Sequence, residues 1–210
     1  MNPRRDLLRV RVRTLGVDLA VEAGAYRRAA VAGVGKDERA WVRRAQAGSE
    51  RDLEALFRAH WPRAYRAAYL VVHDAAAAED IAQEAFVAAV RALDRFDRRR
   101  PFGPWLHRIV VNRAIDWARA RSLRGEVAEE LVPELVAREP DGREVGEPRA
   151  IAEGLAALSP EHRAVVVLRY VLEYTPGEIA DVLELPRGTV NSRLRRALDR
   201  LGGHLGEEGR

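Results

Sequence analysis

Apolar residues recur at spacings of three and four along most of the chain, and this period is typical of amphipathic α-helices. The pattern holds across residues 37–124 and returns across residues 150–205. We therefore expect an all-α fold of two small helical domains, the second followed by a short tail at 206–210. Residues 1–36 show no clean helical stripe and are interpreted as an N-terminal extension of unknown role.

Residues 125–149 interrupt the helical pattern and separate the two predicted domains. The segment contains three prolines, three glycines and eight acidic residues. Proline and glycine disfavour helices, and a segment with so much like charge stays extended. We therefore expect a flexible acidic linker between the domains.

The clearest local signal is a pair of short helices near the C-terminus. Thr175 and Glu178 have the spacing of a capping box, which predicts a helix over residues 176–183. A turn at 184–186 follows, and a second helix is predicted over 187–201 with its apolar residues on one face. This is the pattern of a helix-turn-helix, whose second helix enters the major groove of DNA.

The predicted exposed face of that second helix is rich in side chains that bind DNA. Arginine and asparagine read base edges, whereas arginine, serine and threonine also hold phosphate. Only Asp199 opposes the positive charge. The alternative is an ordinary solvated basic helix in a bundle. The residues that we predict to contact duplex DNA are Arg187, Thr189, Asn191, Ser192, Arg193, Arg195 and Arg196.

Composition narrows the classes of function. The 210 residues include no cysteine, which excludes disulfides, thiolate metal sites and a thiol nucleophile. No run of about 18 apolar residues predicts a membrane span, and no glycine-rich phosphate loop is present. The net charge is +4, and Lys36 is the only lysine. Arginine suits bidentate contacts to phosphate and guanine, although a GC-rich genome would produce the same bias.

A helix predicted over residues 74–92 separates polar from apolar side chains. Asp80, Gln83 and Glu84 share one face, and the opposite face is apolar, with Phe86, Val90 and Leu93. Such a polar face suits docking on a basic protein surface. One alternative is that this face is simply solvated. Another is a metal site formed by carboxylates, but no histidine and no second acidic helix supports it. The residues of such a site would be Asp74, Glu79, Asp80 and Glu84.

Residues 96–117 interleave aromatic side chains with arginines. Aromatic rings stack on unpaired bases and arginines hold the backbone, so the segment suits single-stranded DNA. An amide such as that of Asn112 can hydrogen-bond the exposed edge of an unstacked base. For Trp105 and Ile109 we favour packing in the core.

Three stretches together resemble the extracytoplasmic-function (ECF) family of bacterial sigma factors. They are Gly-Thr-Val-Asn-Ser-Arg-Leu-Arg-Arg-Ala at 188–197, Glu-Asp-Ile-Ala-Gln-Glu-Ala-Phe at 79–86, and the Trp-Leu-x-Arg-Ile-x-x-Asn-x-x-x-Asp spacing that begins at Trp105. The resemblance covers roughly residues 37–201. Asn191 stands where a basic residue is common in the family, so no promoter sequence can be inferred.

The resemblance implies a cytoplasmic sigma factor, which directs RNA polymerase to promoters and assists strand opening. It implies no enzymatic activity, no cofactor, no metal and no membrane insertion. The implied partners are core RNA polymerase, through the clamp helices of its largest subunit and its flap, promoter DNA, and an anti-sigma factor. The linker would run near the polymerase active site, although a plain solvated tether is the simpler interpretation.

The resemblance also implies roles for individual residues. Asp80, Gln83 and Glu84 would bind the polymerase clamp, and the helix after Arg187 would read the minus-thirty-five element. Phe96 and Asn112 would line a pocket for a flipped minus-ten base. The residues implied to hold the melted minus-ten strand are Phe96, Arg99, Arg100, Arg108 and Asn112.

Two other classes of function stay open from the sequence alone. A stand-alone transcription regulator would use the same helix-turn-helix, form a dimer and bind a palindromic site. An α-helical metal hydrolase would bind metal as the isolated chain and lose activity when Glu79 or Glu84 is changed.

Overall fold

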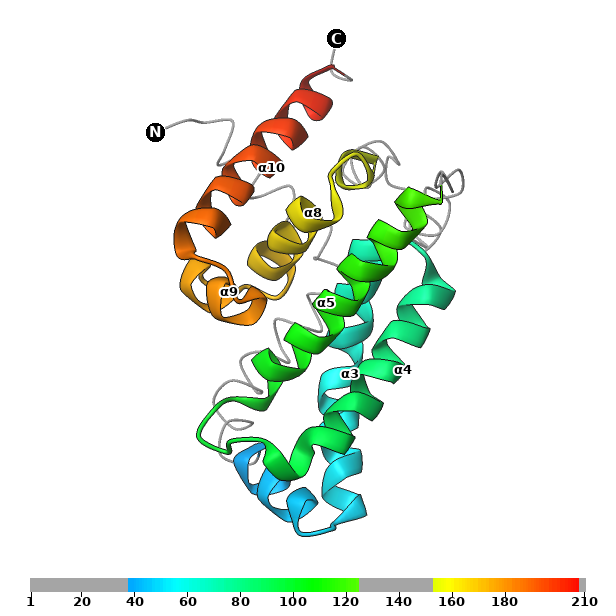
Figure 1. The fold of residues 1–210 in the computed structure, drawn as a ribbon, viewed down its shortest axis with the longest axis vertical. Coiled ribbons are helices and arrows are strands. Elements are labelled where there is room, and N and C mark those ends of the chain that lie inside the picture. Colours follow the sequence, from blue (N-terminus) through cyan, green and yellow to red (C-terminus); the bar gives the residue numbers. More distant parts are fainter. Residues whose placement is uncertain (1–37, 125–152, 208–210) are drawn as a thin grey trace, which may run out of the picture.

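The computed structural model describes residues 38–124 and 153–207, all of whose regular structure is helical. The predicted all-α fold is therefore confirmed (Figure 1). A first helical segment covers residues 38–46. The following elements are α3 (Glu50–Val72), α4 (Ala75–Ala92), the 3₁₀ turn η1 (Leu93–Arg95), α5 (Phe102–Leu123), α8 (Pro160–Val166), the π-helical turn η2 (Val167–Val171), α9 (Pro176–Leu183) and α10 (Arg187–Glu207). The predicted extension and acidic linker lie outside the described residues.

The first half of the chain is a bundle in which α3, α4 and α5 pack against one another. Side-chain caps fix where two of these helices begin. Ser49 accepts a hydrogen bond from the Asp52 N–H, and Asp74 accepts one from the Ala77 N–H at 2.9 Å. Since a capping side chain stabilises a helix start by about 1 kcal/mol, these two caps fix where α3 and α4 begin.

The start of α5 is capped by a residue from far away in the sequence. Pro101 precedes the helix and offers no capping side chain. The Glu38 carboxylate instead accepts the Phe102 N–H at 2.9 Å, and its other oxygen lies 3.4 Å from Nε2 of His60 on α3. Burial alone would raise the pKa of Glu38, but the contacts with His60 and the α5 N–H groups lower it. The segment 38–46 is thereby fastened to both α3 and α5.

The second half of the chain contains the predicted helix-turn-helix. The capping box is confirmed, because Thr175 Oγ1 accepts the Glu178 N–H at 3.3 Å and the Glu178 carboxylate accepts the Thr175 N–H at 2.7 Å. The turn after α9 has Glu184 in the left-handed conformation, with φ of 53°. The second helix extends to Glu207, beyond the predicted end at 201.

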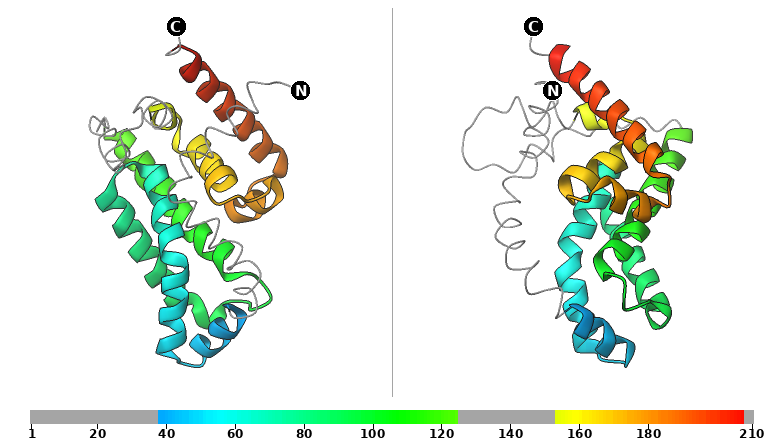
Figure 2. Two further views of the ribbon diagram at one scale, coloured as in Figure 1. Left: turned by 180° about the vertical axis from the view of Figure 1, so that it is seen from behind. Right: turned by 90° about the vertical axis from the view of Figure 1, so that its left-hand side faces the viewer.

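The two halves pack against each other. Helix α5 contacts α8 and α9, and the views in Figure 2 agree that these helices lie side by side. One apolar core includes Leu106 of α5 together with Leu168 and Ile179 of the second half. These side chains are almost completely buried, so the described domains share a core.

Arg163 on α8 is the polar centre of this packing. Its guanidinium is buried and donates to the carbonyl of Val71 at the end of α3. It also donates to the carbonyls of Leu155, Ala156 and Leu158 at 2.9–3.0 Å. Burial lowers the pKa of Arg163 to about 10, so the side chain is still charged at neutral pH.

Candidate nucleic-acid interface

Helix α10 has one buried face and one exposed basic face. Val190, Leu194, Ala197 and Leu201 are all at most 8% exposed and pack inward. Their spacing of three and four residues leaves the opposite face to solvent. The pattern predicted this division correctly.

The residues predicted to contact duplex DNA differ in exposure. Ser192 also donates a hydrogen bond to the Thr189 carbonyl at 2.9 Å, so its hydroxyl is partly engaged within the helix. The exposed residues of the set are Arg187, Asn191, Arg195 and Arg196, and the half-buried ones are Thr189, Ser192 and Arg193.

The residues predicted to bind polymerase lie on the exposed face of α4. Asp80, Gln83 and Glu84 are all exposed. Glu84 pairs with Arg113 of α5 at 2.7 Å, and the Gln83 amide donates to Glu79 at 3.1 Å. The face is therefore polar, as predicted, and part of its charge is already neutralised by α5.

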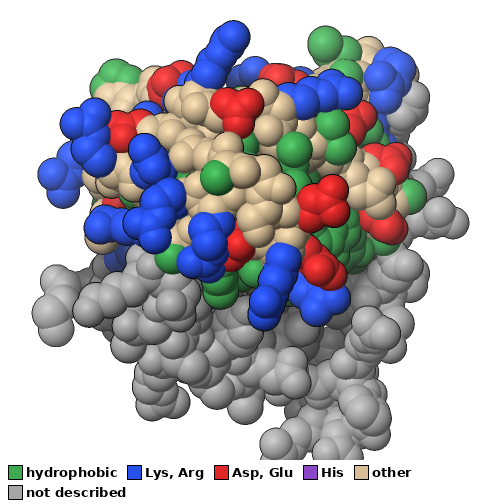
Figure 3. Space-filling model, turned by 90° about the horizontal axis from the view of Figure 1, so that it is seen from below, with side chains coloured by type: hydrophobic (Ala, Val, Ile, Leu, Met, Phe, Trp, Pro, Cys, Tyr) green, Lys and Arg blue, Asp and Glu red, His purple; other side chains and the backbone are tan. Residues whose placement is uncertain are grey.

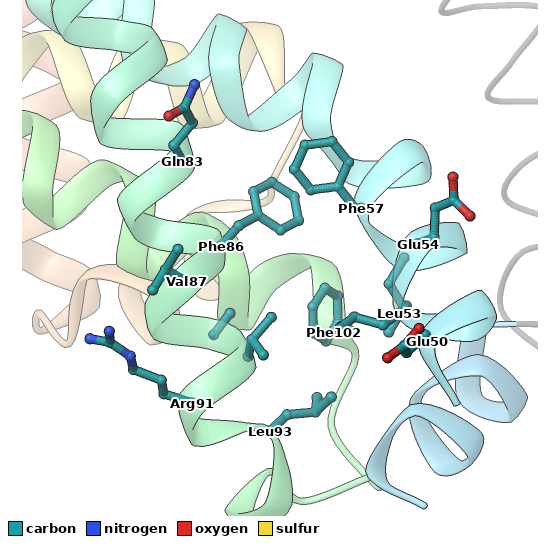
Figure 4. Close-up of a pocket in the computed structure, with 13 residues that line it drawn as sticks. Glu50, Leu53, Glu54, Phe57, Gln83, Phe86, Val87, Arg91, Leu93 and Phe102 are labelled. Atoms are coloured by element: carbon teal, nitrogen blue, oxygen red, sulfur yellow. The ribbon is translucent and has the colours of Figure 1, made fainter. Parts of the chain in front are cut away.

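An apolar groove continues this face toward the end of α4. Val87 and Val90 are 48% and 44% exposed, and Phe57 of α3 is 39% exposed across from them. The groove has a volume of about 620 Å³ (Figure 4). Of the three apolar residues predicted on the face opposite Gln83, Phe86 and Leu93 are buried, whereas Val90 lies at the rim of the groove and is 44% exposed. The sequence signal was available: residues 83, 87 and 90 follow one helical stripe.

The five residues predicted to hold a melted strand are not all at the surface. Phe96 is 8% exposed, and its ring packs on Trp105 with centroids 4.5 Å apart. The Gln46 amide donates to the Phe96 carbonyl at 3.0 Å. Trp105 and Ile109 are partly buried against the same core, which agrees with the packing predicted for them. A contact between Phe96 and a base stays a prediction.

The other four residues of this set are accessible to different degrees. Arg99 and Arg100 are exposed in the turn before α5. Figure 3, which views the molecule from below, shows basic side chains interspersed with acidic ones over that face. Arg99 pairs with Asp97 at 3.1 Å. Asn112 is exposed on α5. Arg108, one helical turn before Asn112, pairs with Glu184 of the helix-turn-helix at 2.5 Å.

The packing between the halves brings together residues that the sequence analysis did not single out. His107 Nδ1 and the Tyr174 hydroxyl share a hydrogen bond of 2.6 Å. Burial, with smaller contributions from the charges of His60 and Arg63, lowers the pKa of His107 to about 3. The histidine is therefore neutral at physiological pH. Helical periodicity cannot show which residue of a distant segment lies opposite a buried side chain such as His107.

Three of the four carboxylates considered for a metal site, those of Asp74, Glu79 and Glu84, have other partners. Asp74 caps α4 and pairs with Arg121 of α5 at 3.1 Å. Within residues 38–124 and 153–207 no group of three or more histidine, aspartate or glutamate side chains is arranged to hold a metal ion. The same described residues include no helix that is long and apolar enough to cross a membrane.

Two family models match the chain. The model described as Sigma-70 region 2 matches residues 56–124, and the model described as Sigma-70, region 4 matches residues 149–201. The first covers the bundle of α3, α4 and α5, and the second covers the helix-turn-helix.

Known proteins resemble the chain over most of its length. The ECF RNA polymerase sigma factor SigW of Bacillus subtilis is 33% identical over 153 residues, which are 67% of this chain and 82% of SigW. The solved structure of CnrH in complex with the cytosolic domain of CnrY is 30% identical, with a TM-score of 0.63, and covers 81% of this chain and 98% of CnrH. A structure of the sigma factor RpoE with the anti-sigma factor NepR from Bartonella quintana is 22% identical, with a TM-score of 0.60, over 74% of this chain and 97% of RpoE.

Proposed function

The chain belongs to the family of ECF RNA polymerase sigma factors, and we propose that it contacts promoter DNA through two separate surfaces. As a member of this family it directs RNA polymerase to specific promoters at the start of transcription. The proposal concerns the residues that carry out the steps, and the observation that carries it is the one-sided basic face of α10 behind a capped helix-turn-helix.

The upstream, duplex-reading surface is the exposed face of α10. Its apolar stripe packs inward, so the arginines and Asn191 point away from the core. Arginine pairs with guanine edges and phosphates in the major groove, and asparagine pairs with adenine. We assign recognition of the minus-thirty-five element to this face.

The strand-holding surface is the start of α5 with the turn before it. Arg99 and Arg100 in the turn offer two guanidinium groups, and Arg108 and Asn112, four residues apart on one face of α5, offer a guanidinium and an amide. Such groups hold a phosphate backbone and a flipped base in proteins that bind single strands. We assign to them the capture of the melted minus-ten strand, so that binding energy opens the duplex.

Polymerase docking is assigned to α4. Asp80 and Gln83 provide polar contacts, and the neighbouring groove of Phe57, Val87 and Val90 adds apolar area. A partner surface that is basic at one end and apolar at the other fits this combination. The clamp helices of the largest polymerase subunit are the proposed partner, with the flap contacting residues 150–205.

The remaining proposals concern the domain boundaries, an anti-sigma partner, the cellular location and the absence of catalytic activity. We propose two domains, at 37–124 and 150–205, joined by residues 125–149. The structures of related sigma factors with CnrY and with NepR support an anti-sigma partner for this chain as well. Core polymerase and promoters are cytoplasmic, so the proposed location is the cytoplasm. The family consists of initiation factors, and we propose no catalytic activity and no cofactor.

The test is run-off transcription with purified core polymerase and genomic fragments. The full chain is expected to produce discrete transcripts that core polymerase alone does not make. A stand-alone regulator would instead bind a palindromic site as a dimer without polymerase. Absence of any chain-dependent transcript, with binding of the isolated chain to a palindrome, would overturn the proposal.

A further inference from the structure

The turn that carries Arg99 and Arg100 is held at its first end by one side chain. The Gln46 amide nitrogen lies 2.8 Å from the Leu93 carbonyl oxygen and 3.0 Å from the Phe96 carbonyl oxygen, and it donates a hydrogen bond to each. The last carbonyls of an α-helix have no partners within the helix, so the end of α4 needs donors from elsewhere. Gln46 supplies both hydrogens of its amide and thereby fixes the backbone where the turn begins.

The other end of the turn is held by the same helical segment. The Glu38 carboxylate accepts the N–H of Phe102, the first residue of α5. Glu38 and Gln46 are eight residues apart in the segment 38–46, which is about two helical turns, so both side chains reach the turn from one side of the segment. We call residues 96–101 the arginine turn, and this turn is therefore clamped at both ends.

The segment 38–46 is itself firmly attached to the bundle. Val42 is 2% exposed in the core. The Arg44 guanidinium donates to the Asp52 carboxylate at 2.8 Å, and the Ser49 hydroxyl donates to the same carboxylate at 2.6 Å. These contacts join the end of the segment to the start of α3, so the segment provides a fixed support for the arginine turn.

Contacts within the arginine turn fix its shape but not its place. The Arg99 N–H donates to the Asp97 carboxylate at 3.0 Å, and the Arg100 N–H donates to the Asp97 carbonyl at 2.9 Å. An aspartate that binds the backbone two residues further on is typical of tight turns. Because these contacts all lie within the turn, its orientation on the bundle depends on the clamps at Gln46 and Glu38.

A turn that is in place before DNA arrives binds more tightly than a mobile one. Ordering a loop on binding costs free energy and so reduces affinity, whereas a loop that is fixed beforehand avoids this cost. Arg99 and Arg100 are exposed, and their backbone is anchored by side chains outside the set predicted to bind DNA. The anchors can therefore fix the position of the two arginines without contacting a strand.

We propose that Gln46 is a positioning residue for strand capture: together with Glu38, it holds the arginine turn where Arg99 and Arg100 can grip the backbone phosphates of a melted strand. The inference rests on the proposed role of these two arginines in strand binding. Gln46 acts through the turn and not by touching DNA. It lies before residue 56, where the match to Sigma-70 region 2 begins, so the inference gives a function to a segment outside the matched region.

The first test measures amide hydrogen exchange in the full chain. Gln46→Met keeps the length of the side chain and removes both donors. Exchange of the Phe96 N–H, which is bonded to the Leu93 carbonyl at 3.0 Å, is expected to be about tenfold faster, because local opening becomes easier. The Ala78 N–H, bonded at the opposite end of α4, should exchange as before. Unchanged exchange at Phe96 would overturn the inference.

The second test measures binding of the holoenzyme to a fluorescent single-stranded oligonucleotide. The oligonucleotide carries the minus-ten strand of a promoter found by run-off transcription. Gln46→Met is expected to weaken this binding about five- to tenfold, the range for loss of two hydrogen bonds, and to change binding to the upstream duplex by less than about twofold. Ser159→Ala, which removes the cap of α8, is the control for a modest loss of stability and should leave strand binding unchanged.

A variant that restores the donors tests how Gln46 acts. Gln46→Lys provides an ammonium group, which donates to carbonyls, and is expected to bind the strand within about twofold of the unmodified chain. Ala47→Lys combined with Gln46→Met places the same charge on the exposed neighbouring residue and should not rescue binding. Equal rescue by the two variants would show that added charge acts in place of the clamp, and would overturn the inference.

The outcomes separate this inference from the proposed function. The loss caused by Gln46→Met must shrink in an Arg100→Ala background, because one of the positioned arginines is then gone. If Arg100→Ala weakens strand binding and Gln46→Met does not, the inference is wrong and the proposed function stands. If Arg100→Ala leaves strand binding unchanged, the proposed role of the turn is wrong and the inference falls with it. Equal losses of strand and duplex binding by Gln46→Met would reveal general destabilisation and would also contradict the inference.

Discussion

The two surfaces proposed to bind DNA differ in how freely they present their residues. On α10, the arginines at 187, 195 and 196 face solvent. On α5 and its preceding turn, Phe96 is packed in the core and Arg108 is paired with the opposite half. The upstream surface is ready to bind as it stands, whereas the strand-holding surface requires a rearrangement. The difference fits an order in which duplex is bound first and a melted strand is captured later.

The two DNA surfaces can be compared directly only if polymerase binds elsewhere, on the exposed face of α4. Asp80→Arg reverses a charge on the exposed face of α4 and is expected to abolish pull-down of core polymerase, because arginine would meet a basic partner surface. Thermal unfolding and duplex binding should be unchanged. Asp199→Arg, an exposed reversal on α10, is the control, and equal retention of polymerase by both variants would contradict the docking assignment.

The packing of the two halves against each other depends on Arg163. Arg163→Met leaves four buried carbonyls without their donor, and each unpaired group costs about 1–3 kcal/mol. We expect the free energy of unfolding to fall by about 3 kcal/mol or more in urea titrations. Arg169→Met removes a single bond to the Tyr174 carbonyl and should cost about 1 kcal/mol. Similar losses in the two variants would show that Arg163 does not hold the interface.

The role of the exposed face of α10 in duplex binding can be tested by replacing one side chain. Arg196→Ala is expected to weaken binding to upstream duplex by roughly 1–3 kcal/mol if the guanidinium reads a base. The loss should be confined to one base position, which competition with single-base variants of the site would reveal. Arg91→Ala, an exposed arginine on α4, should leave duplex binding unchanged. Unchanged binding by Arg196→Ala would remove this residue from the reading set.

The contact between the halves should also respond to pH through His107. Its folded pKa of about 3 lies below the value of about 6.5 for an unfolded histidine. The unfolded chain therefore gains a proton as pH falls below about 6.5, while the folded chain does not until about pH 3. Stability from this residue is complete above pH 6.5 and decreases toward pH 3.

The measurement is urea unfolding at pH 7 and pH 5. His107 alone is expected to reduce the free energy of unfolding by about 1–2 kcal/mol over this interval. His73, whose pKa is also lowered to about 3, mainly by burial, adds a similar decrease. His107→Gln keeps a side chain that can hydrogen-bond Tyr174 and should reduce the pH dependence. An identical pH dependence in this variant would contradict the assignment.

Short-range sequence patterns, such as helix caps and apolar stripes, predicted the helices well. The capping box at Thr175 and the apolar stripe of α10 are both properties of short sequence windows, and each was found where the sequence placed it. Such signals depend on backbone groups within one turn of the residue, so tertiary packing changes them little.

Contacts between distant segments were not predictable in the same way. Glu38 capping α5, Arg163 reaching Val71, and Glu184 pairing with Arg108 each join residues far apart in the sequence. Helical periodicity shows which face is inward but not which helix lies opposite it. For this reason the sequence predicted which helix carries each candidate residue better than how accessible its side chain is.

The bond between Arg163 and Val71 also bears on how the chain is made. The two residues are 92 positions apart, and ribosomes add about 5–20 residues each second, so Val71 is synthesised roughly 5–18 seconds before its partner. During that interval the nascent bundle lacks the α8–α9 half that buries its inner side. A chaperone that binds apolar helix faces would have its best opportunity then, and nascent chains stopped before residue 163 should bind it most strongly.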